Sequence, residues 1–147
     1  MFKHLLVPVD GSELAEHAVN ESVALARQLG ARITAFVAES PSPAAVTGYG
    51  AVNFMRTMEE HGVEAAAHAQ IVISAFRSRA EAAGVPFEGV YTRSLEVDAA
   101  IVEAARSQGC DLIVMATHGR SAFGELLFGS RTRNVLLHSE LPLLVLH

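Results

Sequence analysis

Glycine, serine and arginine gather between residues 116 and 131 in a pattern that can bind phosphate. Gly119 can adopt backbone angles closed to other residues and lets a ligand approach the main chain. Gly129 and Ser130 come directly before a segment that we expect to be a short helix over 130–138. The start of a helix carries free N–H groups and a partial positive charge, and both favour an anion. The Ser130 hydroxyl can either cap this helix or donate to a phosphate oxygen, so the motif alone leaves both interpretations open.

Two arginines fall in the first turn of the same expected helix, where cations oppose the helix dipole. Arg131 and Arg133 each cost about 0.3–1 kcal/mol at such a position when they are exposed. Arg120 lies near the start of the same loop. A bound polyphosphate would turn this unfavourable charge into an attraction. We therefore expect a ligand role for Arg131 and Arg120, and we expect Arg133 to point into water.

Five apolar segments alternate with helical ones along the chain and are expected to form a parallel sheet with helices on both faces. The strands are expected over residues 4–9, 31–38, 87–92, 111–116 and 141–147. The helices are expected over residues 14–29, 53–83, 97–108 and 130–138. Because each crossover is right-handed, covering both faces requires the strand order to reverse once. The reversal leaves a crevice at the carboxyl ends of the strands, which the loops after Val9 and Ala116 can line.

Three local patterns give further expectations about the helices and their connections. Asp10 or Ser12 can cap the first helix, and Glu13 stands three residues after Asp10, as in a capping box. Residues 39–52, which include Tyr49, form a long break that is either a lid over a ligand or a loop without a task. In the long helix, the apolar stripe is expected to consist of Met55, Val63, Ala67, Ile71 and Ala75.

Composition limits the class of protein. The chain has 147 residues, of which half are hydrophobic and 18% are charged, and this is the size of one domain over residues 1–147. The net charge is -5 and the basic residues do not run together, which argues against nucleic acid as a partner. No segment has the length of a membrane span. Cys110 is the single cysteine and is expected to be buried and inert. Because one cysteine cannot form an internal disulfide, we expect a reducing, cytoplasmic location.

Candidate catalytic and metal-binding groups are not evident in the sequence. No serine has a plausible base and orienting group, and there is no P-loop lysine motif. The seven histidines lack convincing ligand spacing and are expected to be solvated or locally bonded. His118 lies inside the glycine-rich loop, where it could orient that loop. We therefore expect no catalytic residues and no metal ligands.

The chain resembles the universal stress protein family over its whole length. The resemblance is carried by VPVDGS (Val7 to Ser12), DLIVMATHGRS (Asp111 to Ser121), the later glycine–serine pair and the terminal LPLLVL. The ATP-binding branch carries the pattern G-x2-G-x9-G-[S/T]. Gly119, nine intervening residues, Gly129 and Ser130 match it in register, and Ala116 stands at the first glycine. The resemblance implies an α/β fold like that of adenine-nucleotide α-hydrolases, with strand order 3-2-1-4-5.

The resemblance also implies roles for individual residues around an adenine nucleotide. Asp10 would face the ribose, Val37 would meet adenine through its main chain, and Met115 would lie beneath the sugar and base. The phosphates would be surrounded by the glycines, Ser130 and Arg131. The expected ligand-binding residues are Pro8, Val9, Asp10, Val37, Met115, Ala116, His118, Gly119, Arg120, Gly129, Ser130 and Arg131.

Ala116 and Leu95 depart from residues that are frequent in the family. If the family glycine needs a positive φ, alanine at position 116 costs on the order of 1–2 kcal/mol. If glycine is needed only for close approach, one methyl group narrows the slot. In either case we expect weakened rather than abolished binding.

The leading hypothesis is a homodimeric stress-response protein that binds ATP, with or without Mg²⁺, and senses or sequesters it. Closure of the 39–52 loop, with Tyr49 over the base, would signal occupancy. The last strand, from Leu141 to His147, is apolar on both faces, and the resemblance implies that it pairs with its twin in a dimer. Two alternatives stay open: a dimeric interaction scaffold with a vestigial site, for which Ala116 is the evidence, and a slow ATPase.

Overall fold

The computed structural model describes residues 1–40, 51–117 and 129–147, in which strands and helices alternate. The strands are β1 (His4–Pro8), β2 (Arg32–Glu39), β3 (Phe87–Arg93), β4 (Leu112–Ala116) and β5 (Leu143–Leu146). The helices are α1 (Glu13–Leu29), α2 (Ala51–Ala82), α3 (Val97–Ser107) and α4 (Ser130–His138). Each element expected from the sequence is present, with its ends within two residues of their expected positions.

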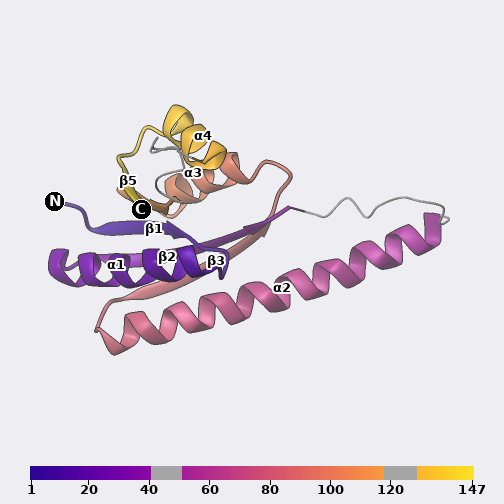
Figure 1. Cartoon of the computed structure of the whole chain (residues 1–147), viewed down its shortest axis with the longest axis horizontal. Helices are drawn as coiled ribbons and strands as arrows, with labels where there is room; N and C mark the ends of the chain where they lie inside the picture. Colours follow the sequence, from indigo (N-terminus) through magenta and orange to yellow (C-terminus); the bar gives the residue numbers. More distant parts are fainter. Residues whose placement is uncertain (41–50, 118–128) are drawn as a thin grey trace, which may run out of the picture.

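The strands form one parallel sheet in the order β3-β2-β1-β4-β5, which confirms the expected fold. The order reverses between β1 and β4, which pair through Leu5 with Leu112 and Leu6 with Ile113. Helices cover both faces: α2 runs below the sheet in Figure 1, and α3 and α4 lie above it. The reversal therefore places the carboxyl ends of β1 and β4 next to each other, with the following segments leaving towards different faces.

Alternate residues of each central strand supply two separate hydrophobic cores. In β1, Leu5 and Val7 pack in the core under α1 and α2, whereas Leu6 packs in the core under α3 and α4. In β2, Val37 belongs to the first core and Phe36 to the second. This follows from the two-residue repeat of a strand, which sends neighbouring side chains to opposite faces. Strands buried on both faces are therefore apolar throughout.

The expected apolar stripe of α2 is wrong from Val63 to Ala75, and the side chain of Met55 lies outside the described ones. Val63 and Ile71 are each 71% exposed, and the buried residues are instead Ala69, Ile73, Phe76 and Ala80. The expected stripe advances mainly in steps of four, which rotate about 40° around the helix each time, because a turn holds 3.6 residues. The buried set alternates steps of four and three and so stays on one face. The first half of α2 also extends beyond the sheet (Figure 1), and Val63, which lies in this half, is exposed.

Two glycines meet special geometric demands of the fold, one at the end of a helix and one where a helix packs against a strand. Gly30 ends α1 in the left-handed conformation, with φ of 61°, as the sequence predicts. Gly89 lies inside β3, where glycine ordinarily weakens a strand. A Cβ atom at Gly89 would overlap the Cγ2 atom of Ile73 on α2. Glycine is therefore needed there because the helix packs directly against the strand.

A buried polar pair lies near the amino ends of the strands, away from the crevice. The Nε2 atom of His4 and the hydroxyl of Thr34 are 2.7 Å apart. Burial, together with the charge of Arg32, lowers the pKa of His4. Cys110 is buried, as expected, and its burial raises the pKa of the thiol to about 11. A thiol with such a pKa is almost wholly protonated near neutral pH and is therefore a poor nucleophile.

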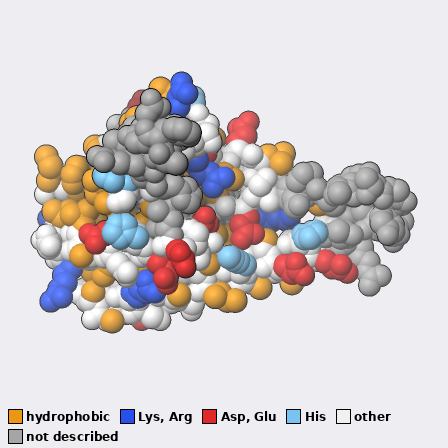
Figure 2. Space-filling view, viewed as in Figure 1, with side chains coloured by type: hydrophobic (Ala, Val, Ile, Leu, Met, Phe, Trp, Pro, Cys, Tyr) orange, Lys and Arg blue, Asp and Glu red, His pale blue; other side chains and the backbone are white. Residues whose placement is uncertain are grey.

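The surface shown in Figure 2 carries acidic and basic side chains interspersed among its coloured residues. No helix within the described ranges combines the length and the apolar character that a membrane span requires.

Replacing Gly89 by alanine should lower the free energy of unfolding by about 1–3 kcal/mol, because the new methyl group overlaps Ile73. The same replacement in an Ile73→Ala background should cost much less, because the space is then free. Urea denaturation of the four proteins measures both costs as a double-mutant cycle. An equal loss in both backgrounds would show that the contact between β3 and α2 is not the reason for glycine.

Candidate functional site

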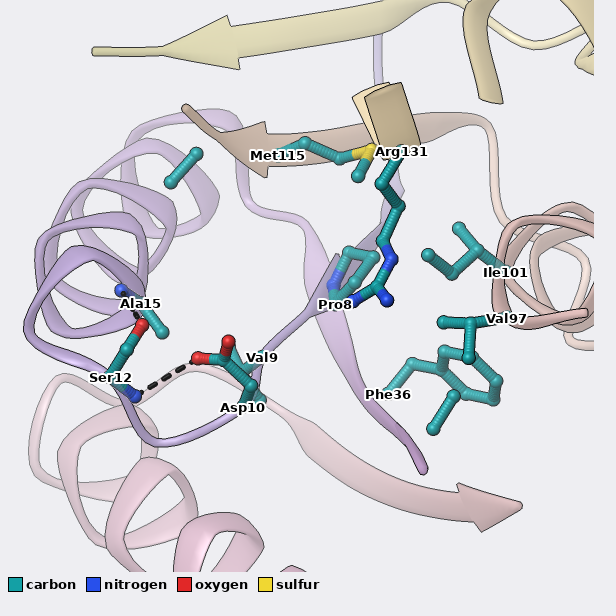
Figure 3. Close-up of a pocket in the computed structure, with 12 residues that line it drawn as sticks. Pro8, Val9, Asp10, Ser12, Ala15, Phe36, Val97, Ile101, Met115 and Arg131 are labelled. Atoms are coloured by element: carbon teal, nitrogen blue, oxygen red, sulfur yellow. Dashed lines mark hydrogen bonds between the residues drawn. The ribbon is translucent and has the colours of Figure 1, made fainter. Parts of the chain in front are cut away.

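A cavity of about 110 Å³ opens at the carboxyl ends of β1, β2 and β4 (Figure 3). It therefore occupies the reversal of strand order, where the crevice was expected. Its walls come from these strand ends, the start of α1, one side of α3 and the first turn of α4. The lining residues are Pro8, Val9, Asp10, Ser12, Ala15, Phe36, Ala38, Val97, Ile101, Met115, Ala116 and Arg131.

One side of the cavity is apolar. Phe36, Ile101 and Met115 contribute side chains that are otherwise buried in the core under α3 and α4. Val97 lies between Phe36 and Ile101 in Figure 3, and these three side chains, together with Met115 from β4, make up an apolar wall that continues the same core. Such a wall can accept the face of a flat ring, with a few polar groups at its rim fixing the orientation.

Asp10 and Ser12 form the polar rim beside α1. The Oγ atom of Ser12 accepts a hydrogen bond from the Ala15 amide at 3.2 Å and so caps α1. The Ser12 amide in turn donates to the Oδ1 atom of Asp10 at 2.9 Å. The expected capping box between Asp10 and Glu13 is wrong, because Glu13 is itself the first helical residue and Ser12 is the cap.

The carboxyl of Asp10 is held in its ionised form. Burial alone would raise the pKa of Asp10, but four effects outweigh it and leave this pKa below its ordinary value. These are hydrogen bonds from the side chain and the backbone of Ser12, a hydrogen bond from the backbone of Asp10 itself, and the charge of Arg131. Asp10 therefore presents a carboxylate at the cavity, a group that accepts hydrogen bonds from hydroxyl groups.

The first turn of α4 begins without a side-chain cap among the described residues. Gly129 occupies the cap position and has no side chain to donate or accept, and Ser130 is already the first helical residue. Of the two roles that the sequence left open for Ser130, capping is therefore excluded by its position. The first hydrogen bond of the helix runs from the Arg133 amide to the Gly129 carbonyl at 3.1 Å. The amides before Arg133 are the groups that a helix start offers to an anion.

Arg131 projects from this turn into the cavity. Its guanidinium lies between Pro8 and Val97 in Figure 3. The Nε atom is 3.4 Å from the Oδ1 atom of Asp98, in the first turn of α3. This carboxylate offsets part of the cost of a cation at a helix start, a compensation that the sequence pattern did not reveal. Arg133 is exposed, as expected.

Ala116 ends β4 in ordinary strand geometry. No non-glycine residue in the described ranges has a positive φ, so alanine carries no backbone strain at this position. Of the two costs considered for Ala116, only the narrowing of the slot remains. Its methyl group lines the cavity beside Met115, and its strand pairs with β5 through Leu146.

Several of the expected ligand-binding residues lie together at the cavity, namely Pro8, Val9, Asp10, Met115, Ala116 and Arg131. Gly129 and Ser130 begin α4 immediately before Arg131 but are not among the lining residues. The side chain of Val37 packs in the opposite core, under α1 and α2, while its strand neighbours line the cavity. His118, Gly119 and Arg120 lie outside the described residues, as does Tyr49.

Sequence reasoning missed the apolar wall. Phe36 and Ala38 flank Val37 in β2, so the two-residue repeat of the strand could have identified them as the side chains facing the cavity. Val97 and Ile101 are one helical turn apart on α3, and no local motif marked either of them as a ligand-binding residue. Within the described residues, no group of three or more His, Cys, Asp or Glu side chains is arranged to hold a metal ion.

Fold and cavity together define a parallel α/β protein with a ligand cavity at its strand reversal. The sequence model of the Universal stress protein family matches residues 1–147. A universal stress protein from Thermus aquaticus is 32% identical over 148 residues, covering 99% of this chain and 98% of the relative. The chain therefore belongs to the universal stress protein family.

Solved structures of the family share this fold. A universal stress protein in complex with cAMP matches with a TM-score of 0.71 and 26% identity, over 99% of this chain and 97% of the other. A universal stress protein from Archaeoglobus fulgidus in complex with dAMP matches with a TM-score of 0.68 and 21% identity, over 99% of this chain and 98% of the other.

Replacing Ser12 by alanine should lower the free energy of unfolding by about 1 kcal/mol, because α1 loses its cap. The pKa of Asp10 should rise, because the hydroxyl of Ser12 helps to lower it. Denaturation and a carboxyl-detected NMR titration measure the two effects. Ser78→Ala is the matched control, since this hydroxyl donates to the Ser74 carbonyl within α2. An unchanged pKa of Asp10 in the Ser12 variant would contradict this account of the rim.

Proposed function

We propose that this universal stress protein binds an adenine nucleotide, with ATP as the ligand, and acts as a dimeric sensor or regulator in stress response. The main support is the start of α4, which has no side-chain cap among the described residues. It lies directly before Arg131, whose side chain lines the cavity. Two similar universal stress proteins, solved in complex with cAMP and with dAMP, support the adenine-nucleotide class.

The proposed pose uses each wall of the cavity for one part of the ligand. The base lies against the apolar wall of Phe36, Val97, Ile101 and Met115, with the main chain near Val37 at its edge. The ribose hydroxyls face the carboxylate of Asp10. The phosphates reach the amides at the start of α4, where Ser130 and Arg131 lie.

The glycine-rich loop completes the proposed phosphate site. We include His118, Gly119 and Arg120 in this site only because of their spacing to Gly129 and Ser130, since these three residues lie outside the described ones. Mg²⁺ would arrive with the phosphates, as it does at sites where one or two protein groups and the nucleotide share it. We propose no catalytic residue, so the nucleotide is sensed or held rather than consumed.

The proposed dimer forms through the last strand. Within the described residues β5 pairs only with β4, so its outer edge carries unpaired backbone groups. Leu136, Leu137 and Leu144 are large hydrophobic residues exposed on α4 and β5. A second copy that pairs from Leu141 to His147 would cover this edge. We propose a cytoplasmic location, and neither nucleic acid nor membrane is a proposed partner.

A dimeric scaffold with a vestigial site is the second candidate, and the size of the cavity favours it. The cavity of about 110 Å³ is small beside the roughly 300–1,000 Å³ of typical ligand pockets. The methyl group of Ala116 contributes to that narrowness. In such a protein the fold and the β5 edge would be retained while the ligand is lost.

Calorimetric titration with ATP and Mg²⁺ separates the two candidates. The protein should bind ATP, and Ala116→Gly should raise its affinity by roughly fivefold, because removing the methyl group relieves about 1 kcal/mol of crowding in the cavity. Ala67→Gly, at an exposed position of α2 outside the cavity lining, is the matched control and should leave the affinity unchanged. ATP should remain intact after long incubation. Absence of binding at millimolar ATP, or a rise of several hundredfold in Ala116→Gly, would favour the scaffold instead.

A further inference from the structure

Arg131 acts through its charge on two carboxylates, those of Asp98 and Asp10. Its Nε atom lies 3.4 Å from the Oδ1 atom of Asp98. Its charge also acts on Asp10, where it helps to lower the pKa of that carboxyl. Asp10 lines the cavity together with Arg131, whereas Asp98 is not among the lining residues. The positive charge that projects into the cavity is therefore partly compensated before any ligand arrives.

Asp98 is fixed in place independently of Arg131. The Oδ2 atom of Asp98 accepts a hydrogen bond from the Nδ2 atom of Asn134, one turn along α4, at 2.8 Å. The Asp98 side chain is 31% exposed, and it lies in the first turn of α3, where the helix dipole favours a carboxylate. Because of these contacts, Asp98 can hold Arg131 without following it towards a ligand.

We propose that Asp98 sets how strongly the site distinguishes ligands by their phosphate charge. This inference rests on the proposed nucleotide-binding function. A phosphate group that approaches the start of α4 must share Arg131 with Asp98, so each added negative charge gains less than it would from a free guanidinium. The effect is a weaker dependence of affinity on phosphate number, in which ATP still binds most tightly but gains less over ADP and AMP than it would from a free guanidinium. Asp98 is a specificity-determining residue that acts through Arg131 and does not touch the ligand.

Calorimetry on the full chain tests this with adenosine, AMP, ADP and ATP. Asp98→Asn keeps the shape and the partner Asn134 but removes the charge. It should raise the affinity for ATP by about three- to tenfold, raise that for AMP less, and leave adenosine unchanged. The ATP affinity should also fall more steeply with added salt than in the parent protein.

Glu103→Gln is the matched control. Glu103 also lies on α3 and pairs with an arginine, Arg106, at 2.8 Å, but neither residue lines the cavity. Its replacement should leave all four affinities unchanged. In an Arg131→Gln background, Asp98→Asn should have no effect on ATP, because the proposed action needs the guanidinium.

Each further outcome contradicts one claim. If Asp98→Asn leaves ATP affinity unchanged or lowers it, or shifts adenosine as much as ATP, the inference about Asp98 is wrong while nucleotide binding stands. The same holds if the effect persists without Arg131. If the parent protein binds none of the four ligands, the proposed function is wrong and the role of Asp98 falls with it.

Discussion

The reversal of strand order between β1 and β4 is the constraint on which the rest of the molecule depends. In a parallel sheet with right-handed crossovers, helices reach both faces only if the order turns back once. That turn lies between β1 and β4, and it sends α1 to one face and α4 to the other. The carboxyl ends of the two strands are left side by side, and the cavity opens there, because the helices that follow the two strands lie on opposite faces of the sheet.

The two helices that begin at this edge differ in how their first amides are satisfied. In α1, the Ser12 side chain accepts from the Ala15 amide, and Asp10 accepts from the Ser12 amide. In α4, the cap residue is Gly129, which supplies no side-chain acceptor. Among the described residues, an anion therefore meets a carboxylate at the start of α1 and amides without a side-chain acceptor at the start of α4. In the proposed pose this asymmetry orients the nucleotide, with its hydroxyl groups towards Asp10 and its phosphates towards α4.

The helices and strands could be predicted well from the sequence, because they depend on patterns that span only a few residues. Such patterns are the strand and helix periods, Gly30 and the Gly129–Ser130 pair. The features that it did not predict depend on contacts between distant segments. Arg131 pairs with Asp98 across two helices, and Gly89 is needed because Ile73 packs on it. The buried face of α2 is chosen by the sheet beneath it, so Phe76 and Ile73 are buried while Ile71 is exposed. Whether alanine at position 116 strains the backbone or only narrows the cavity could be decided only from its backbone angles.

Amide NMR during ligand titration tests most directly whether the amides at the start of α4 bind the phosphates. ATP should strongly shift the amide signals of Ser130, Arg131 and Thr132. Adenosine should shift these signals little while still perturbing residues beside the apolar wall. Equal shifts of these three signals with ATP and adenosine, or no shift with saturating ATP, would contradict binding of the phosphates by these amides.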